Sequence, residues 1–133
     1  MTLSTSQLNH PEVLQEITGV FLRYEDALVA NDVDALNAYF WASPCTTRYG
    51  IGDKQLGHEA LVAYRQTVPP PNFTRQLHEV RITAFGADMA VAMTEFTRSD
   101  TTLRGFQTQT WVRFSDGWKI VSAHVSMIPF TPG

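Results

Sequence analysis

The sequence predicts an α+β domain in which three helices come first and a curved antiparallel sheet follows. Three observations support this fold class. Apolar residues recur every three or four positions before residue 67, they alternate every second position after residue 72, and turn residues separate four strand-like runs. Helices followed by consecutive strands favour helices packed on one face of an antiparallel sheet. The 133 residues suit a single domain over 1–133, with a core from about residue 11 to 128.

The first helix is predicted from Pro11 to Ala30. Asn9 or His10 can cap its start, and Pro11 is well suited to the first turn of a helix. The apolar stripe turns Tyr24 toward the sheet, where a buried phenol normally has a hydrogen-bond partner. The stripe consists of Val13, Ile17, Val20, Phe21, Tyr24 and Leu28.

Two shorter helices and a short strand are predicted next. Asp32 caps a helix over 33–40, because an aspartate accepts a hydrogen bond from the first turn. Residues 46–49 form a β-prone run that ends at glycine. A third helix over 57–67 is stopped by the proline triplet 69–71.

Four long strands are predicted over 74–85, 89–98, 105–114 and 118–127, the last pair joined by a Ser115-Asp116-Gly117 hairpin turn. Strict alternation divides the last strand into two faces. Val121, Ala123, Val125 and Met127 share one face, and Trp118, Ile120, Ser122, His124 and Ser126 share the other. We expect the apolar face with Val121, Ala123 and Val125 to form a homodimer interface.

Composition excludes several classes of function. The net charge is −3, and no run of basic residues could displace the counterions of a nucleic acid. No apolar stretch is long enough to span a membrane, and the first nine residues lack the pattern of a signal peptide. Cytoplasmic location is the resulting expectation. The single cysteine, Cys45, cannot form an internal disulfide, and we interpret it as a small structural residue rather than a nucleophile.

A ligand cavity is predicted from neutral hydrogen-bonding residues beside aromatic ones, such as Gln109 next to Trp111. The same residues could instead form a dimer interface. Arg48 offers a guanidinium fork suited to a carboxylate, or it pairs with a surface acid such as Glu25 or Asp26. The four histidines have no metal-ligand spacing, so a metal site is not expected. No Gly-rich phosphate loop is present either, so no cofactor is expected.

The order of the elements resembles the nuclear-transport-factor-like superfamily, which includes ketosteroid isomerases and SnoaL-like proteins. The likeness is strongest to the oxalurate-catabolism HpxZ and AtzH-like group. It is carried by residues 23–33, Phe40-Trp41, the Thr-Arg-Tyr-Gly-Ile-Gly run over 47–52, residues 107–111 and the Ala-His-Val-Ser ending over 123–126. It spans about residues 11–128. It implies a cone-shaped α+β barrel that is frequently dimeric.

The resemblance implies a cofactor-free decarboxylase that acts on a small N-carboxylated urea or ureide, such as 1,3-dicarboxyurea, in nitrogen catabolism. Tyr24 and Arg48 match the positions of the tyrosine and arginine associated with that reaction. Arg48 would hold the carboxylate of a small anionic substrate, and Tyr24 would deliver a proton. Trp41, Gln109, Trp111 and His124 would bind the substrate from the walls of the cavity.

Two other functions stay open. One is a non-catalytic protein that binds a ureide or assists a neighbouring enzyme of ureide catabolism, because a fold does not determine function. The other is a ketosteroid-isomerase-like enzyme, which needs an aspartate base. Asp88, Asp100 and Asp116 all lie in predicted turns, which weakens that second alternative.

Overall fold

The computed structural model describes residues 2–131. All three predicted helices and all four long strands are present, together with a second short strand that the sequence did not indicate. After a 3₁₀ turn at Thr5–Gln7, the elements in chain order are α1 (Pro11–Ala30), α2 (Val33–Tyr39), β1 (Thr47–Tyr49), β2 (Lys54–Leu56), α3 (His58–Thr67), β3 (Arg75–Phe85), β4 (Met89–Arg98), β5 (Arg104–Phe114) and β6 (Gly117–Ile128).

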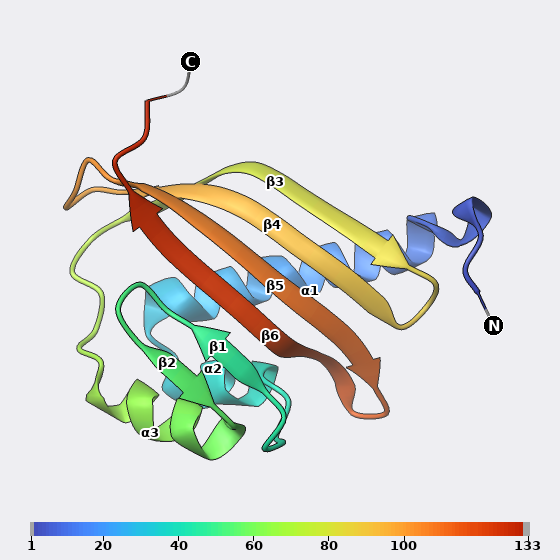
Figure 1. Cartoon of the computed structure of the whole chain (residues 1–133), viewed down its shortest axis with the longest axis horizontal. Helices are drawn as coiled ribbons and strands as arrows, with labels where there is room; N and C mark the ends of the chain where they lie inside the picture. The colour runs from blue at the N-terminus through green and yellow to red at the C-terminus, as the bar shows by residue number, and fades with distance from the viewer. Residues whose placement is uncertain (1, 132–133) are drawn as a thin grey trace.

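The strands form one six-stranded sheet in the order β2-β1-β6-β5-β4-β3. The four long strands pair antiparallel, as predicted. β1 adds to β6 in the parallel direction, and β2 pairs antiparallel with β1 at the edge. The sheet is curved, and its edge strands β2 and β3 do not meet, so the barrel expected from the resemblance is an open one (Figure 1).

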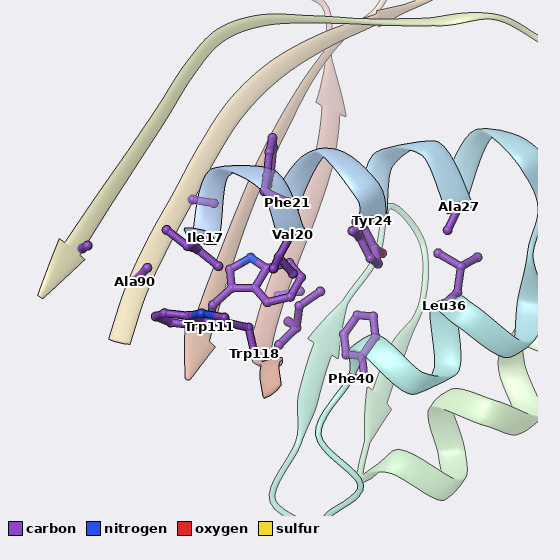
Figure 2. Close-up of a cluster of buried hydrophobic side chains, with 14 of the residues drawn as sticks. Ile17, Val20, Phe21, Tyr24, Ala27, Leu36, Phe40, Ala90, Trp111 and Trp118 are labelled. Carbon is purple, nitrogen blue, oxygen red and sulfur yellow. The ribbon is translucent and has the colours of Figure 1, made fainter. Parts of the chain in front are cut away.

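The core lies between α1 and one face of the sheet. Ile17, Phe21 and Tyr24 of α1 are buried in this core, and Figure 2 shows Trp111 and Trp118 of the sheet lying beside the helix, with Tyr24 directed toward Phe40. On β3 and β4 three alanines are fully buried in this core, Ala84, Ala90 and Ala92, and Leu77 and Ile82 of β3 pack against it. Small side chains at these positions let the helix approach the sheet closely, because close-packed interiors leave no room for larger ones.

Capping follows the prediction for α2 and differs for α1. The Asp32 carboxylate accepts a hydrogen bond from the backbone N–H of Ala35 (3.2 Å). At the start of α1, neither Asn9 nor His10 caps the helix with its side chain. The Asn9 side-chain oxygen instead accepts from the backbone N–H of Ala84 (2.9 Å), which ties the start of α1 to β3.

The prediction that Ser122 and His124 continue the face of Trp118 and Ile120 is wrong, because β6 contains a β-bulge. Trp111 pairs with Ile120 and Thr110 pairs with Ser122, so Val121 is an extra residue without a partner on β5. An extra residue reverses the alternation beyond it. Trp118 and Ile120 therefore face the helices, and so does Ala123. His124 is exposed on the opposite, outer face.

This correction changes the residues of the expected dimer interface. Ala123 and Val125 line a cavity under the helices, so they cannot belong to an outer interface. The outer face of the sheet instead carries mostly uncharged residues, paired across the strands. They are Thr47, Tyr49, Val91, Met93, Thr108, Thr110, Ser122 and His124. Arg81, Glu95 and Arg104 lie on the same face outside this set. The uncharged patch formed by the eight residues is suited to a partner subunit.

The homodimer itself stays a prediction, now assigned to the outer face. We expect a solution mass of about twice the 14.9 kDa of the chain, measured by light scattering at micromolar concentration. Met93→Lys should give a monomer, because a charge would be desolvated at the interface. Leu22→Lys is the matched control, since Leu22 lies on α1 and is similarly exposed (48% against 53%). A monomeric wild-type protein would contradict the prediction.

No helix in residues 2–131 is both long and apolar enough to cross a bilayer. The cytoplasmic location stays a prediction.

Candidate functional site

A cavity of about 370 Å³ lies between the C-terminal half of α1, α3 and the sheet. Its floor comes from β4, β5 and β6, and Arg48 of β1 contributes from the side. The segment 68–73, which contains the three prolines, closes one wall. Proline fixes its own φ angle and restricts the residue before it, so this wall is stiff although it has no regular structure. The volume is in the range of small-molecule sites.

The charged residues on the cavity wall are all arginines. Arg48, Arg65, Arg75 and Arg98 line it, and within residues 2–131 no aspartate or glutamate does. Three of these guanidinium groups have a carboxylate partner behind the wall: Arg48 pairs with Asp53, Arg75 with Glu25 and Arg98 with Asp100. The cavity therefore presents positive groups to a ligand, while the carboxylates that pair with three of them lie outside its lining.

Arg48 is held by a network of hydrogen bonds on the β2 side. Its Nη1 donates to Asp53 Oδ1 (2.7 Å) and to Gln55 Oε1 (2.9 Å). Asp53 also accepts from the Gln55 amide (2.9 Å) and from the Tyr64 hydroxyl (3.1 Å). The alternative of a surface pair with Glu25 or Asp26 is wrong. Arg48 does have an acidic partner, but that partner is Asp53, and the pair lies beside the cavity.

Partial burial raises the pKa of Asp53, but hydrogen bonds from Gln55, Arg48 and Tyr64 and the charge of Arg48 outweigh it and lower the pKa below the ordinary value. Asp53 is therefore ionised at neutral pH. The network holds the Arg48 guanidinium in place through hydrogen bonds from Nη1. Its Nε and Nη2 make no hydrogen bond to another described residue and stay available to a ligand.

We expect Asp53→Asn to lower the free energy of unfolding by about 1–2 kcal/mol at pH 7, through loss of charge-assisted hydrogen bonds. A lowered folded-state pKa contributes stability that is complete above the unfolded value, near 4, and is lost as the pH falls through the folded value. The difference between wild type and variant should therefore be constant from pH 7 to about 4 and shrink below it. Urea unfolding at several pH values measures this. A difference that grows toward low pH would contradict it.

Arg75 is the most completely bonded of the four arginines. Its Nε and Nη2 donate to the two carboxylate oxygens of Glu25 (2.7 and 3.3 Å), and Nη2 also donates to Gln107 Oε1 (2.7 Å). The guanidinium lies 3.9 Å from the ring centre of Phe96. Gly105 makes this arrangement possible, because a Cβ there would overlap the Phe96 ring.

The two glutamines of β5 present donors to the cavity. The Arg75 guanidinium can only donate, so the atom of Gln107 that it contacts must be the oxygen, and the amide nitrogen is left over. The same argument holds for Gln109, whose oxygen accepts from the Trp111 indole N–H (3.0 Å). The Gln107 nitrogen is buried and has no partner among the described residues. Both side chains therefore favour a ligand rich in hydrogen-bond acceptors.

Tyr24 adds a hydroxyl to this wall. Its ring is fixed by edge-to-face contacts with Tyr39, Phe40 and Trp111, at centroid distances of 5.8, 6.2 and 6.1 Å. The side chain is buried and lines the cavity, and no hydrogen bond joins its hydroxyl to a group in residues 2–131. The hydroxyl is therefore free to bond a ligand, in contrast to the protein partner expected from the sequence.

The structure brings Tyr24, Arg48 and Gln109 together on one cavity, as the sequence predicted, and does not place the other three predicted residues on its lining. Trp111 lies in the core beneath it and supports Tyr24 and Gln109. Trp41 stacks on Phe114 (5.2 Å). His124 contacts Tyr49 on the outer face. The expectation that Trp41 and His124 shape the cavity is corrected: Trp41 packs elsewhere, and the bulge at Val121 turns His124 outward.

Sequence reasoning missed most of the wall, including the polar residues Arg65, Arg75, Arg98 and Gln107. Gln107 follows the same alternation as Gln109 and could have been found from it. The three arginines carry no local signal, because an arginine in a helix or at a strand end is usually a surface residue.

Comparison of this chain with known proteins identifies the family to which it belongs. The family model described as AtzH-like matches residues 6–130. A search of the curated proteins finds no match. Among solved structures, a protein of unknown function from Pectobacterium atrosepticum is 44% identical, with a TM-score of 0.94, over 96% of this chain and all of that one.

Two further structures extend the comparison. A cystatin-like fold protein from Burkholderia xenovorans is 48% identical, with a TM-score of 0.91, over 93% of this chain and 98% of that one. A putative ketosteroid isomerase from Parabacteroides distasonis has a TM-score of 0.70 at 19% identity, over 92% and 96% of the two chains. At that identity the likeness shows the fold alone, which is the nuclear-transport-factor-like fold.

Proposed function

From the premise that this chain belongs to the AtzH-like family, we propose that its cavity binds a small N-carboxylated urea or ureide and removes carbon dioxide from it without a cofactor. The substrate class resembles 1,3-dicarboxyurea, and the setting is the catabolism of nitrogen compounds.

The composition of the cavity wall is the observation that carries this proposal. Four arginines line it together with the amide groups of two glutamines and the Tyr24 hydroxyl, and no carboxylate of residues 2–131 does. Every one of these polar groups can donate a hydrogen bond. A compact anion rich in carbonyl and carboxylate oxygens accepts such bonds and offsets the positive charge.

The chemistry needs a cation and a proton donor. Arg48 would hold the carboxylate that leaves, using the guanidinium nitrogens that Asp53 and Gln55 do not engage. As the N–C bond breaks, its electron pair goes to the urea nitrogen and carbon dioxide departs. Tyr24 would give its proton to that nitrogen, and water would return a proton to the phenolate. A positioned acid typically contributes roughly 10²–10⁴ in rate.

A ketosteroid-isomerase-like reaction is disfavoured by the same wall. That reaction requires a carboxylate base next to the substrate, which moves a proton from one carbon to another. Within residues 2–131 the lining contains no carboxylate. Glu95, in the middle of β4, pairs with Arg104 (2.9 Å).

Release of carbon dioxide from 1,3-dicarboxyurea tests the proposal. The rate with protein should exceed the spontaneous rate measured in the same buffer, and chelating agents should leave it unchanged. A rate equal to background, with binding of the compound retained, would replace the proposal with the alternative of a ureide-binding accessory protein.

A further inference from the structure

Arg65 differs from the other three arginines of the cavity. It lies on α3 one turn after Leu61, and these two residues form the buried side of that helix. Its side chain belongs to the cavity wall, although the residue is only 7% exposed. A guanidinium this deeply buried is rare unless it has a partner.

No such partner is present in residues 2–131. Arg48, Arg75 and Arg98 each have a carboxylate at 2.6–2.7 Å, whereas Arg65 has none within 4.0 Å. Its Nε is fully buried without a hydrogen bond. The position in the last turn of α3 stabilises the charge slightly, by roughly 0.3–1 kcal/mol through the helix dipole. That contribution supplies no acceptor for the Nε proton.

Gln107 supplies a second unsatisfied donor on the same cavity. Its oxygen accepts from Arg75, so its amide nitrogen can only donate to another group. That nitrogen is buried and has no partner in the described part of the chain. Two buried donors of one cavity, one of them charged, therefore lack an acceptor among residues 2–131. Leaving such groups unpaired is unfavourable, so the arrangement is suited to a ligand that supplies the missing acceptor.

We propose that Arg65 and Gln107 form a carboxylate-binding subsite, which holds an acidic group of the ligand that the reaction leaves intact. The subsite deepens the proposed function: the substrate carries a second anionic end besides the carboxylate that Arg48 would hold. Its existence as an anion site does not depend on turnover. The charged fork of Arg65 favours a carboxylate over a neutral amide of the same shape.

The test uses anions that cannot lose carbon dioxide by this route, oxamate and N-carbamoylglycine, with oxamide as the neutral match for oxamate. Calorimetry should show binding of an anion to the wild-type protein and at least about tenfold weaker binding of oxamide, because bonds to charged groups are the stronger ones. Arg65→Met should weaken anion binding by at least about tenfold. Arg104→Met is the control, because Arg104 has Glu95 as a partner (2.9 Å) and does not line the cavity. We expect it to change binding by less than about threefold.

The melting temperature without ligand separates a ligand-binding role from a structural one. If Arg65 has no protein partner, replacing it with methionine removes an uncompensated buried charge, and the variant should melt at or above the wild-type temperature. A structural arginine would instead leave its partner unpaired, and the melting temperature would fall. Three results would each overturn the proposal. They are a lower melting temperature of Arg65→Met, anion binding that is unchanged in Arg65→Met, and no binding of either anion to the wild-type protein. Absence of decarboxylation with anion binding intact would overturn only the proposed function.

Discussion

Tyr24→Phe is expected to lower the turnover number on 1,3-dicarboxyurea by about 10²- to 10⁴-fold, while substrate affinity changes by less than about threefold. The variant removes only the hydroxyl that would deliver the proton. The ring keeps its contacts with Tyr39, Phe40 and Trp111. The hydroxyl has no hydrogen-bond partner among the described residues, so its loss should change the free energy of unfolding by less than about 1 kcal/mol. Turnover is measured as release of carbon dioxide above the spontaneous rate.

Tyr39→Phe is the matched control for this variant. Tyr39 packs edge-on against both Tyr24 and Trp111, at 5.8 and 6.2 Å, but it does not line the cavity. It should retain wild-type turnover. Full activity in Tyr24→Phe would rule out the proton-donor role. An equal loss in both tyrosine variants would indicate that the packing of the aromatic cluster, rather than the Tyr24 hydroxyl, limits the reaction.

Arg75→Met is expected to give the largest loss of stability, about 3–5 kcal/mol in the free energy of unfolding. Arg75 and Glu25 are 50 residues apart in the chain and join β3 to α1 through a buried pair, with side chains only 8% and 12% exposed. Removing the arginine leaves the Glu25 carboxylate buried without its counter-charge and frees the oxygen of Gln107. Urea unfolding at pH 7 measures the loss.

Two further variants show whether the uncompensated charge is the cause. Arg98→Met breaks a more exposed pair, with side chains 23% and 39% exposed, and should destabilise the protein far less than Arg75→Met, because exposed ion pairs contribute little. The double variant Arg75→Met/Glu25→Leu removes both charges and should recover much of the stability lost in the single one. A double variant as unstable as Arg75→Met alone would instead assign the loss to packing against Phe96.

The elements of this fold are largely determined by local sequence. The 3.6-residue stripe of α1, the Asp32 cap of α2 and the alternation of the four long strands each depend on neighbours within one element, and all are present in the structure. Tyr24 follows directly from the stripe. The sequence did not indicate β2, because Lys54-Gln55-Leu56 is too short to show a period and becomes a strand only by pairing with β1.

The functional site depends more on contacts between distant segments. The bulge at Val121 arises where β6 pairs with β5, and one extra residue there moves His124 from the expected cavity wall to the outer face. Arg65, Arg75 and Arg98 look like ordinary surface arginines in the sequence, yet the fold places all three on one cavity. The local pattern of a helix or strand fixes which side a residue occupies. Tertiary packing decides which charged side chains meet and which arginine of the cavity wall has no carboxylate partner among the described residues. The distances between charges on different elements do not follow from the sequence of any single element.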